Sequence, residues 1–506
     1  LTCPPTARQV EHLPRDLSPY SPTGGERGLL QLRGKIAKFA DMKKLLTFAA
    51  VLAGLALAAA CGPSKGTARS FDVYLSADSS AVLHAFLPEK PSGRAVVCLP
   101  GGGYSHLAVD HEGRDWQEFF CPRGIALFVL EYRMPGGDRT IPMGDALNAL
   151  RTVREHASEW KVNPRDVGIM GSSAGGHLAA VTSVLTPLSE RPAFQILFYP
   201  VITLDLWGGH EGSSRNFLGA DVDNPDTVAA FSAHENVPRH NAPPAIIFLS
   251  ADDNVVPAGF NGVPYAQAML LAENPVVMHM YPEGGHGWGY RSSFACHGEM
   301  LESLGRWLDS LPSVREDAVK VACIGDSITD GHQIFPAWSL GYPAVLQGLL
   351  GDGYEVRNFG LSASTLQNGA DIPYMAESIW RECLDFRPDV AVIKLGTNDS
   401  KPWNRHGREP LEADLQQMVD ALRALPSAPR ILLCTPVPVF ENPYQISEDA
   451  ILEDIAPAIR AVAERNGLEI IDLHSAVSDC ALFQPDGVHP NARGAAAMAS
   501  AVAAAL

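Results

Sequence analysis

The stretch DVGIMGSSAGGH, residues 166–177, decides the fold of the first half of this chain. It begins with a short apolar run typical of a buried strand, and small residues then lead into a helical pattern. Similar apolar runs alternate with longer amphipathic stretches on both sides of it. This alternation predicts an α/β domain in which helices cover both faces of a parallel sheet. The predicted strands are 95–99, 126–130, 167–170, 194–199, 245–250 and 276–281, and the predicted helices are 144–160, 175–185 and 293–311.

A polar, proline-containing break at 311–317 ends the first pattern, and the alternation then starts again. The second half is therefore predicted to be another α/β domain, smaller and with five strands. We expect the domains to span residues 70–312 and 318–506. The predicted strands of the second half are 319–324, 354–359, 390–394, 430–434 and 469–472, and its helices are 409–425, 449–466 and 491–505.

Composition narrows the possible partners. The chain is 46% hydrophobic and 19% charged, which is typical of globular proteins. Its formal net charge of −18 argues against a nucleic-acid partner, which would favour a basic face. The nine cysteines show no CxxC spacing and no HExxH motif is present, so the sequence implies neither a metal site nor a cofactor.

The N-terminal region contains a targeting signal. Met42-Lys43-Lys44 precedes an apolar run that ends in three alanines and Cys61. A basic start, a short apolar core and small residues predict a signal peptide over 42–60. The alternative is a membrane-spanning anchor, but the run of 16 residues is shorter than the roughly 20 that a span needs. Because the chain begins with Leu1, we interpret residues 1–41 as an over-extended reading frame, or else as a disordered extension.

The junction at Cys61 resembles the lipobox of bacterial lipoproteins. The resemblance implies a lipid on Cys61, a tether over 61–69 and a membrane partner. It also implies an exported lipoprotein anchored in the periplasm or at the outer membrane.

Residues 171–175, GSSAG, lie between a predicted strand and a predicted helix. This is the context of a nucleophile elbow, which would expose Ser173 above the sheet. The loop PGGGY, residues 100–104, follows another core strand. The N–H groups of Gly102, Gly103 and Ala174 are candidates for an oxyanion hole. An ordinary flexible turn at 100–104 is the alternative.

An acid and a histidine follow the elbow in the order Ser, Asp, His. Residues 251–257, ADDNVVP, come after one predicted strand, and His286 comes after the next. With these motifs, residues 70–311 resemble the α/β-hydrolase family of bacterial acetylxylan and feruloyl esterases. The resemblance implies that Ser173 attacks an ester, that His286 is its base, and that Asp253 orients His286, with Asp252 as the rival acid.

Four short blocks of the second half also follow predicted strands or precede the last helix: GDSIT (325–329), NFG (358–360), GTND (396–399) and DGVHPN (486–491). Together they resemble the GDSL, or SGNH, hydrolases. The resemblance implies a nucleophile at Ser327, a base at His489 and an orienting acid at Asp486. It implies an oxyanion hole made by the N–H groups of Ser327 and Gly360 and by the side chain of Asn398.

These resemblances imply a lipid-anchored, bifunctional serine esterase that removes acetyl or feruloyl groups from oligo- or polysaccharides. The string 396–403 is similar to the branch of sialate O-acetylesterases and related sugar deacetylases. The alternatives are a lipase or lysophospholipase, and a glycan-binding lipoprotein with one silent domain. The sugar, the acyl group and the oligomeric state stay open.

Overall fold

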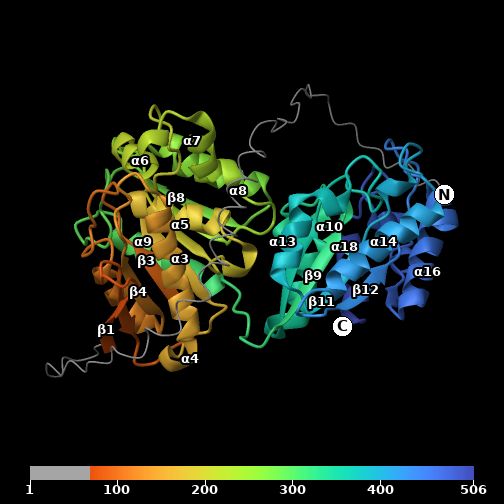
Figure 1. The fold of residues 1–506 in the computed structure, drawn as a ribbon, viewed down its shortest axis with the longest axis horizontal. Coiled ribbons are helices and arrows are strands. Elements are labelled where there is room, and N and C mark those ends of the chain that lie inside the picture. The colour runs from red at the N-terminus through yellow and green to blue at the C-terminus, as the bar shows by residue number, and fades with distance from the viewer. Residues whose placement is uncertain (1–68) are drawn as a thin grey trace.

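The computed structural model describes residues 69–506. These residues form two α/β units that lie side by side, each built on its own sheet (Figure 1). The predicted signal peptide, Cys61 and the leader 1–41 lie outside the described residues. Within the part that is described, no helix is long and apolar enough to cross a membrane.

The first sheet has eight strands in the order β1-β2-β4-β3-β5-β6-β7-β8. The strands from β4 to β8 are parallel, whereas β2 runs antiparallel to both β1 and β4. The strands are β1 (Arg69–Tyr74), β2 (Val82–Leu87), β3 (Ala95–Leu99), β4 (Ala126–Glu131), β5 (Val167–Ser172), β6 (Gln195–Phe198), β7 (Ala245–Ser250) and β8 (Val276–Tyr281).

Helices cover both faces of this sheet, and two of them, α6 and α7, lie beyond one end of it (Figure 1). The predicted helix 144–160 is two helices, because the backbone at His156 leaves the helical range. The α-helices of this unit are α2 (Gln117–Phe120), α3 (Thr140–Glu155), α4 (Ala157–Trp160), α5 (Ser173–Leu185), α6 (Glu211–Leu218), α7 (Pro225–Phe231), α8 (Gly262–Leu271) and α9 (His297–Ser310).

The second sheet has five parallel strands in the order β10-β9-β11-β12-β13. This is the order of flavodoxin-like folds, in which active groups gather at the carboxyl ends of the strands. The α/β class predicted for both halves is confirmed. The strands are β9 (Val319–Gly325), β10 (Tyr354–Gly360), β11 (Val390–Lys394), β12 (Arg430–Cys434) and β13 (Glu469–Ile471).

The helices of the second unit flank its sheet on both faces (Figure 1). The predicted helix 449–466 contains a π-helical segment, η10 (Ile451–Ile455), between two α-helices. The α-helices are α10 (Ser327–Asp330), α11 (Ala337–Leu340), α12 (Tyr342–Leu350), α13 (Ser378–Phe386), α14 (Arg408–Arg423), α15 (Glu448–Ala450), α16 (Ala456–Asn466), α17 (Leu473–Ala476) and α18 (Ala492–Ala503).

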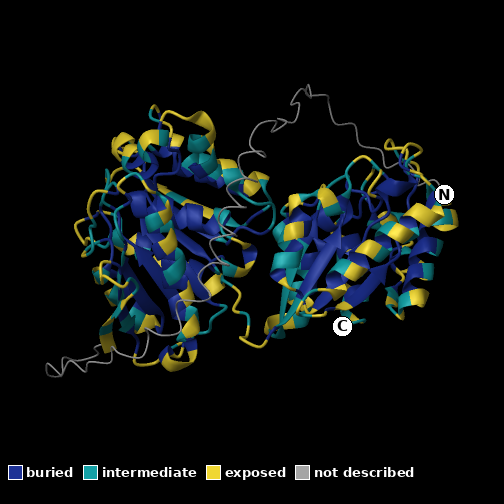
Figure 2. Ribbon diagram, in the orientation of Figure 1, coloured by how far each residue is buried: buried dark blue, intermediate teal, exposed yellow. Residues whose placement is uncertain are grey.

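Each sheet has a hydrophobic core on both of its faces. The central strands are buried, while the helices carry their exposed residues on the outside (Figure 2). One core residue of the second unit comes from the first: Leu188, in the short helix η3 (Leu188–Glu190), belongs to the cluster that includes α13. The two units are therefore packed against each other as well as linked by the chain.

Candidate active sites

Ser173 lies at the sharp turn from β5 into α5. Its φ of +52° is in the left-handed region, which is strained for a residue with a side chain. The turn requires glycine on both sides. A Cβ on Gly171 would lie 2.1 Å from the carbonyl oxygen of Gly175, and a Cβ on Gly175 would lie 2.0 Å from that of Leu99. The GSSAG motif thus forms the elbow that its sequence predicts.

The structure brings Ser173, His286 and Asp253 together. The Ser173 hydroxyl lies 2.8 Å from Nε2 of His286, and Nδ1 of the same ring lies 2.7 Å from Oδ2 of Asp253. Because a carboxylate only accepts, Nδ1 donates to Asp253 and Nε2 is left to accept the serine proton. Asp252, the rival acid, instead accepts from the backbone N–H of Gly285 at 2.8 Å.

The glycine loop after β3 lies against the nucleophile. A Cβ on Gly101 would lie 2.9 Å from Cβ of Ser173, and Gly102 and Gly103 have φ values of +134° and +62°. Ala174 is the second residue of α5, so its N–H has no partner within the helix. The glycine loop therefore meets the elbow at Gly101, next to the positive end of α5, where an oxyanion is favoured.

Two residues that the sequence did not single out support this site. Glu112 is buried, accepts from the N–H of Gly101 at 2.8 Å, and accepts from the hydroxyl of Tyr199 at 2.8 Å. The Tyr199 hydroxyl in turn accepts from the N–H of Gly289, three residues after His286. Glu112 thus ties the glycine loop to the histidine loop. A carboxylate far from any motif gives no sequence signal for this role.

His210 is a further residue that the sequence did not indicate. Its ring lies 3.5 Å from the position of a Cβ on Gly103. Burial, and next the charge of His286, lower the pKa of His210, so its ring is largely neutral at pH 7. Its Nδ1 also accepts from the N–H of Ser213 and thereby caps α6. His210 therefore connects the helices beyond the sheet to the candidate oxyanion loop.

The second site contains an equivalent set. The Ser327 hydroxyl lies 2.9 Å from Nε2 of His489, and Nδ1 of His489 lies 2.7 Å from Oδ2 of Asp486. Burial alone would raise the pKa of Asp486, but hydrogen bonds from the ring and backbone of His489 and from Val488 lower it to about 2. Asp486 is therefore ionised at neutral pH. Asn491 accepts from two N–H groups at the start of α18 and so fixes this loop to the helix.

Asn398 is buried, and one of its amide N–H groups donates to the carbonyl of Ser364 at 3.0 Å. Ser327 is the first residue of α10, so its N–H has no partner within the helix. The N–H of Gly360, the third predicted donor, already has a partner. It donates to Oδ1 of Asn358 at 2.8 Å, in a tight turn at the end of β10. A substrate oxyanion would have to share this donor with Asn358.

The second site also rests on a buried ion pair that the sequence did not indicate. Nζ of Lys394 lies 2.9 Å from both oxygens of Asp326 and 2.6 Å from the hydroxyl of Thr397. Both charged side chains are fully buried. The pair joins the residue before the nucleophile to the segment that carries Asn398. Asp399 binds the N–H groups of Leu366 and Gln367, which fits a loop-bracing role.

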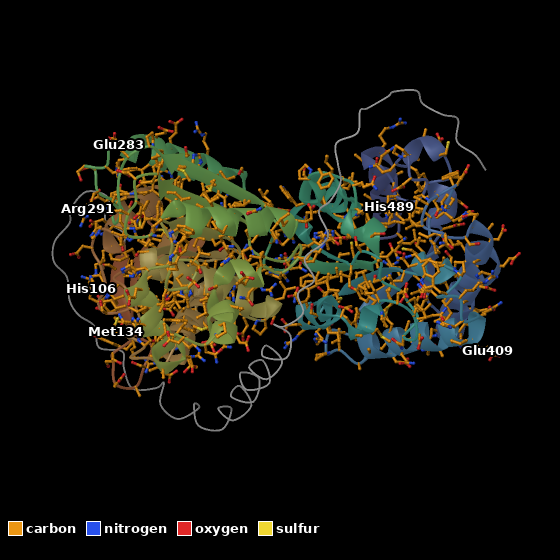
Figure 3. The ribbon with its side chains drawn as sticks, turned by 90° about the horizontal axis from the view of Figure 1, so that it is seen from above. His106, Met134, Glu283, Arg291, Glu409 and His489 are labelled. Carbon is orange, nitrogen blue, oxygen red and sulfur yellow. The ribbon has the colours of Figure 1, made fainter. Side chains whose placement is uncertain are left out.

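The two triads belong to different units. Figure 3 places His489 in the second unit. It places Glu283 and Arg291, which flank His286 in sequence, at the end of the first unit that points away from the second. In residues 69–506, no group of three or more His, Cys, Asp and Glu side chains could hold a metal ion.

Two α/β sheets, each with a Ser-His-Asp set at the carboxyl ends of its strands, define the class of serine carboxylic ester hydrolases. Comparisons with known proteins support the same class. Residues 323–497 match the GDSL-like lipase/acylhydrolase family, and residues 83–261 match the BD-FAE family. The chain is a carboxylic ester hydrolase.

Over most of its length the chain is similar to the acetylxylan esterase of Xylanibacter ruminicola. The two are 47% identical over 459 residues, which cover 87% of this chain and 96% of the relative. The chain belongs to the family of this acetylxylan esterase.

Other similarities are limited to part of the chain. The endo-1,4-β-xylanase B of Butyrivibrio fibrisolvens is 32% identical over 210 residues, which cover 38% of this chain and 32% of that protein. A solved structure, the acetyl ester-xyloside bifunctional hydrolase of Caldicellulosiruptor lactoaceticus, is 28% identical with a TM-score of 0.45. The match covers 49% of this chain and 98% of the chain in that structure.

Proposed function

We propose that this protein removes O-acetyl groups from xylan at two separate active sites. The observation that carries the proposal is the presence of two complete Ser-His-Asp sets, one in each unit. The xylan assignment rests on the name of the Xylanibacter relative and on its match over 96% of that protein. The experiment is acetate release from acetylated xylan, acetylated mannan and acetylated sialic acid.

The chemistry at the first site follows from its geometry. Oγ of Ser173 forms a bond to the acetyl carbon while Nε2 of His286 takes the serine proton. The N–H groups around the elbow stabilise the oxyanion, and Asp253 stabilises the imidazolium. When the C–O bond to the sugar breaks, His286 returns the proton to the sugar oxygen. Water then attacks the acyl carbon while His286 takes a proton from it. The bond from the acyl carbon to Oγ of Ser173 breaks, His286 returns the proton to Oγ, and acetic acid leaves as acetate and a proton. Ser327, His489 and Asp486 repeat these steps at the second site.

An exposed aromatic pair near the first site supports a polymeric substrate. Trp207 is 86% exposed, and its ring centre lies 5.5 Å from that of Phe260. Trp207 lies on the loop that begins at Val201, whose N–H donates to the carbonyl of Ser173, and that ends at His210. It also lines a cavity of about 470 Å³. Because pyranose rings present C–H faces that pack on aromatic rings, Trp207 is suited to hold a sugar next to the scissile ester.

This role predicts a separation between large and small substrates. In a chain with Ser327→Ala, Trp207→Ala should raise KM for acetylated xylan roughly 5-fold or more, because one exposed stacking contact is worth about 1 kcal/mol. KM for 4-nitrophenyl acetate should stay within about 2-fold. Trp403, which is half-exposed in the second unit, provides the matched control as Trp403→Ala. Equal KM for xylan in all three chains would remove Trp207 from substrate binding.

We further propose that the second site favours a different acetylated sugar position or sugar. The proposal rests on the similarity of residues 396–403 to sialate O-acetylesterases and related deacetylases. Feruloyl esters are the second acyl group to test, since the family resemblance of the first unit includes feruloyl esterases. Release of ferulate and of sialate-bound acetate by each single-site variant measures both preferences.

The lipid anchor is a proposal that rests on the sequence alone. Cys61 would carry the lipid after cleavage of 42–60, and the protein would be held in the periplasm or at the outer membrane. Intact-mass analysis of the membrane fraction should show an acylated Cys61, and Cys61→Ser should release an active, unlipidated protein. A soluble native product with no lipid mass would contradict the anchor.

A further inference from the structure

A loop of the first unit contacts the helix that carries the second nucleophile. The loop joins the short helix η5 (Ala233–Asn236) to β7, and it carries Arg239, His240 and Asn241. Nε of Arg239 lies 2.6 Å from Oδ1 of Asp330, and Nε2 of His240 lies 2.5 Å from the same oxygen. Asp330 is the last residue of α10, the helix that begins with the nucleophile Ser327. Two side chains of one unit thus bind the helix that carries the other unit's nucleophile.

Asp330 links that helix to the candidate oxyanion segment. Its side chain is fully buried, and its second oxygen accepts from the hydroxyl of Ser362. The backbones also touch, since a Cβ on Gly360 would lie 2.1 Å from the N atom of Asp330. The position of Asp330 therefore sets the position of Gly360–Ser362 relative to Ser327.

Asn241 contacts the same segment from the other side. Its side-chain amide donates to the carbonyl of Asn358 at 3.3 Å, and the side chain of Asn358 accepts from the N–H of Gly360. The three consecutive residues of the loop therefore contact both structures that border the second oxyanion site, namely α10 and the end of β10.

The first unit holds this loop in a defined shape. His240 has a φ of +61°, which is uncommon for a residue with a side chain, and its N–H donates to the carbonyl of Ala272 at 2.8 Å. Its side chain is only 3% exposed. A strained residue with a buried polar side chain persists only where the surroundings fix it. The first unit thus fixes the backbone at His240, from which the side chain reaches Asp330.

The contact also compensates an unfavourable charge at the C-terminus of α10. A helix of four residues is too short to be stable alone. A carboxylate at its last residue meets the partial negative charge of the helix C-terminus, which is unfavourable unless cations or donors compensate. Arg239 and His240 supply that compensation from the first unit.

We propose that Arg239, His240 and Asn241 are positioning residues for the second active site, so that the second esterase depends on a loop of the first unit. The inference rests on the proposed function of the Ser327 triad. None of the three residues contacts Ser327, His489 or Asp486 in the hydrogen bonds of the described chain. They act through Asp330 and Asn358, by holding the nucleophile and the oxyanion donors in register.

The test uses the full chain with Ser173→Ala, so that only the second site reports, and 4-nitrophenyl acetate as the probe. His240→Leu should lower kcat by about 10- to 100-fold, because small displacements of a catalytic constellation have effects of this size. KM should change by less than about 3-fold. His240→Gln, which keeps an N–H donor at a similar reach, should restore most of kcat. Asp330→Asn should lower kcat about as much as His240→Leu, and the double variant should be no worse than either single one.

A matched control distinguishes the proposed positioning role from a general loosening of the interface between the two units. Asp385 accepts from the N–H and hydroxyl of Ser189 in the same interface, away from α10. Asp385→Asn should leave kcat within about 2-fold of the parent. Equal loss in Asp385→Asn and His240→Leu, or an unchanged kcat in His240→Leu, would overturn the inference.

Two further measurements detect damage to the first unit and failure of the proposed function of the second site. With Ser327→Ala in place of Ser173→Ala, His240→Leu should keep the turnover of the first site. An equal fall at the first site would mean that the substitution disrupts the first unit, and the inference would be wrong. If the Ser173→Ala parent hydrolyses no ester at all, the proposed function of the second site fails first, and the inference fails with it.

Discussion

Asn398 has two side-chain N–H groups, and the fold uses one of them to bind the carbonyl of Ser364. We expect the other to donate to the oxyanion beside Ser327. Asn398→Ala should therefore lower kcat at the second site by about 10²–10³-fold, the usual effect of losing one oxyanion donor. The measurement is turnover of 4-nitrophenyl acetate in a chain with Ser173→Ala. Asn368→Ala, at an exposed asparagine, is the control, and an unchanged kcat in Asn398→Ala would remove the residue from the hole.

For the first site, we predict that a substitution of Glu112 lowers the activity. Both of its oxygens accept from donors, the Gly101 N–H and the Tyr199 hydroxyl. Glu112→Gln would direct an amide N–H at one of these donors and so separate the glycine loop from the histidine loop. We expect kcat at the first site to fall about 10-fold or more in a chain with Ser327→Ala. Glu118→Gln, at an exposed neighbour, should have no effect; equal rates in the two variants would show that Glu112 only fills space.

At the scale of the elements, the sequence predicts the buried parallel strands well, because each is a short apolar run. Strands β3, β7 and β11 agree with their predictions residue for residue. The sequence does not predict the hairpin of β1 and β2. Strand β1 alternates between exposed and half-buried residues, β2 alternates between half-buried and buried ones, and His84 interrupts the apolar residues of β2.

The residues of the candidate sites also divide into those that the sequence predicts and those that it does not. The motif residues are predictable because they follow a strand or, for Asp486 and His489, precede the last helix, and the structure brings each Ser-His-Asp set together. Contacts across long sequence distances leave no local pattern. Lys394 pairs with Asp326 from 68 residues away, and Arg239 reaches Asp330 from another unit. The sequence leaves the acid of the first triad open between Asp253 and Asp252. In the structure Oδ2 of Asp253 lies 2.7 Å from Nδ1 of His286, whereas Asp252 accepts from the N–H of Gly285.

Because α10 ends at the buried Asp330, we expect the free energy of unfolding to depend on pH. Burial alone would raise the pKa of Asp330, but its bonds to His240 and the charges of His240 and Arg239 lower it to about 2. An unfolded aspartate has a pKa of about 3.9, so the folded state favours the ionised form. This stabilisation, on the order of 2 kcal/mol, is present above about pH 4 and is lost as the pH falls from 4 to 2.

Urea unfolding at several pH values measures this effect. The free energy of unfolding of the wild type should exceed that of Asp330→Asn at pH 6, and the difference should shrink as the pH falls from 4 toward 2. A difference that stays constant over this range would show that Asp330 does not titrate with the lowered pKa.

At the scale of the whole molecule, two different α/β folds each hold a Ser-His-Asp set in one chain and share an interface. Ion pairs of Arg165 with Glu355 and of Arg191 with Glu382 join the units, and the α13 side of the second unit faces the first (Figure 1). The triads nevertheless belong to separate sheets. The arrangement predicts two activities that can be abolished independently, with a one-way dependence of the second site on the loop of the first unit.

The most direct test of the two-site account is acetate release from acetylated xylan by the wild type, Ser173→Ala, Ser327→Ala and the double variant. Each single variant should retain the activity of the other site and lose its own by roughly 10⁴-fold or more. The double variant should show no release above background, and the rates of the single variants should add up to most of the wild-type rate. If one single variant abolished release from every acetylated substrate tested, the other site would be silent, and the account of two working esterases in one chain would be contradicted.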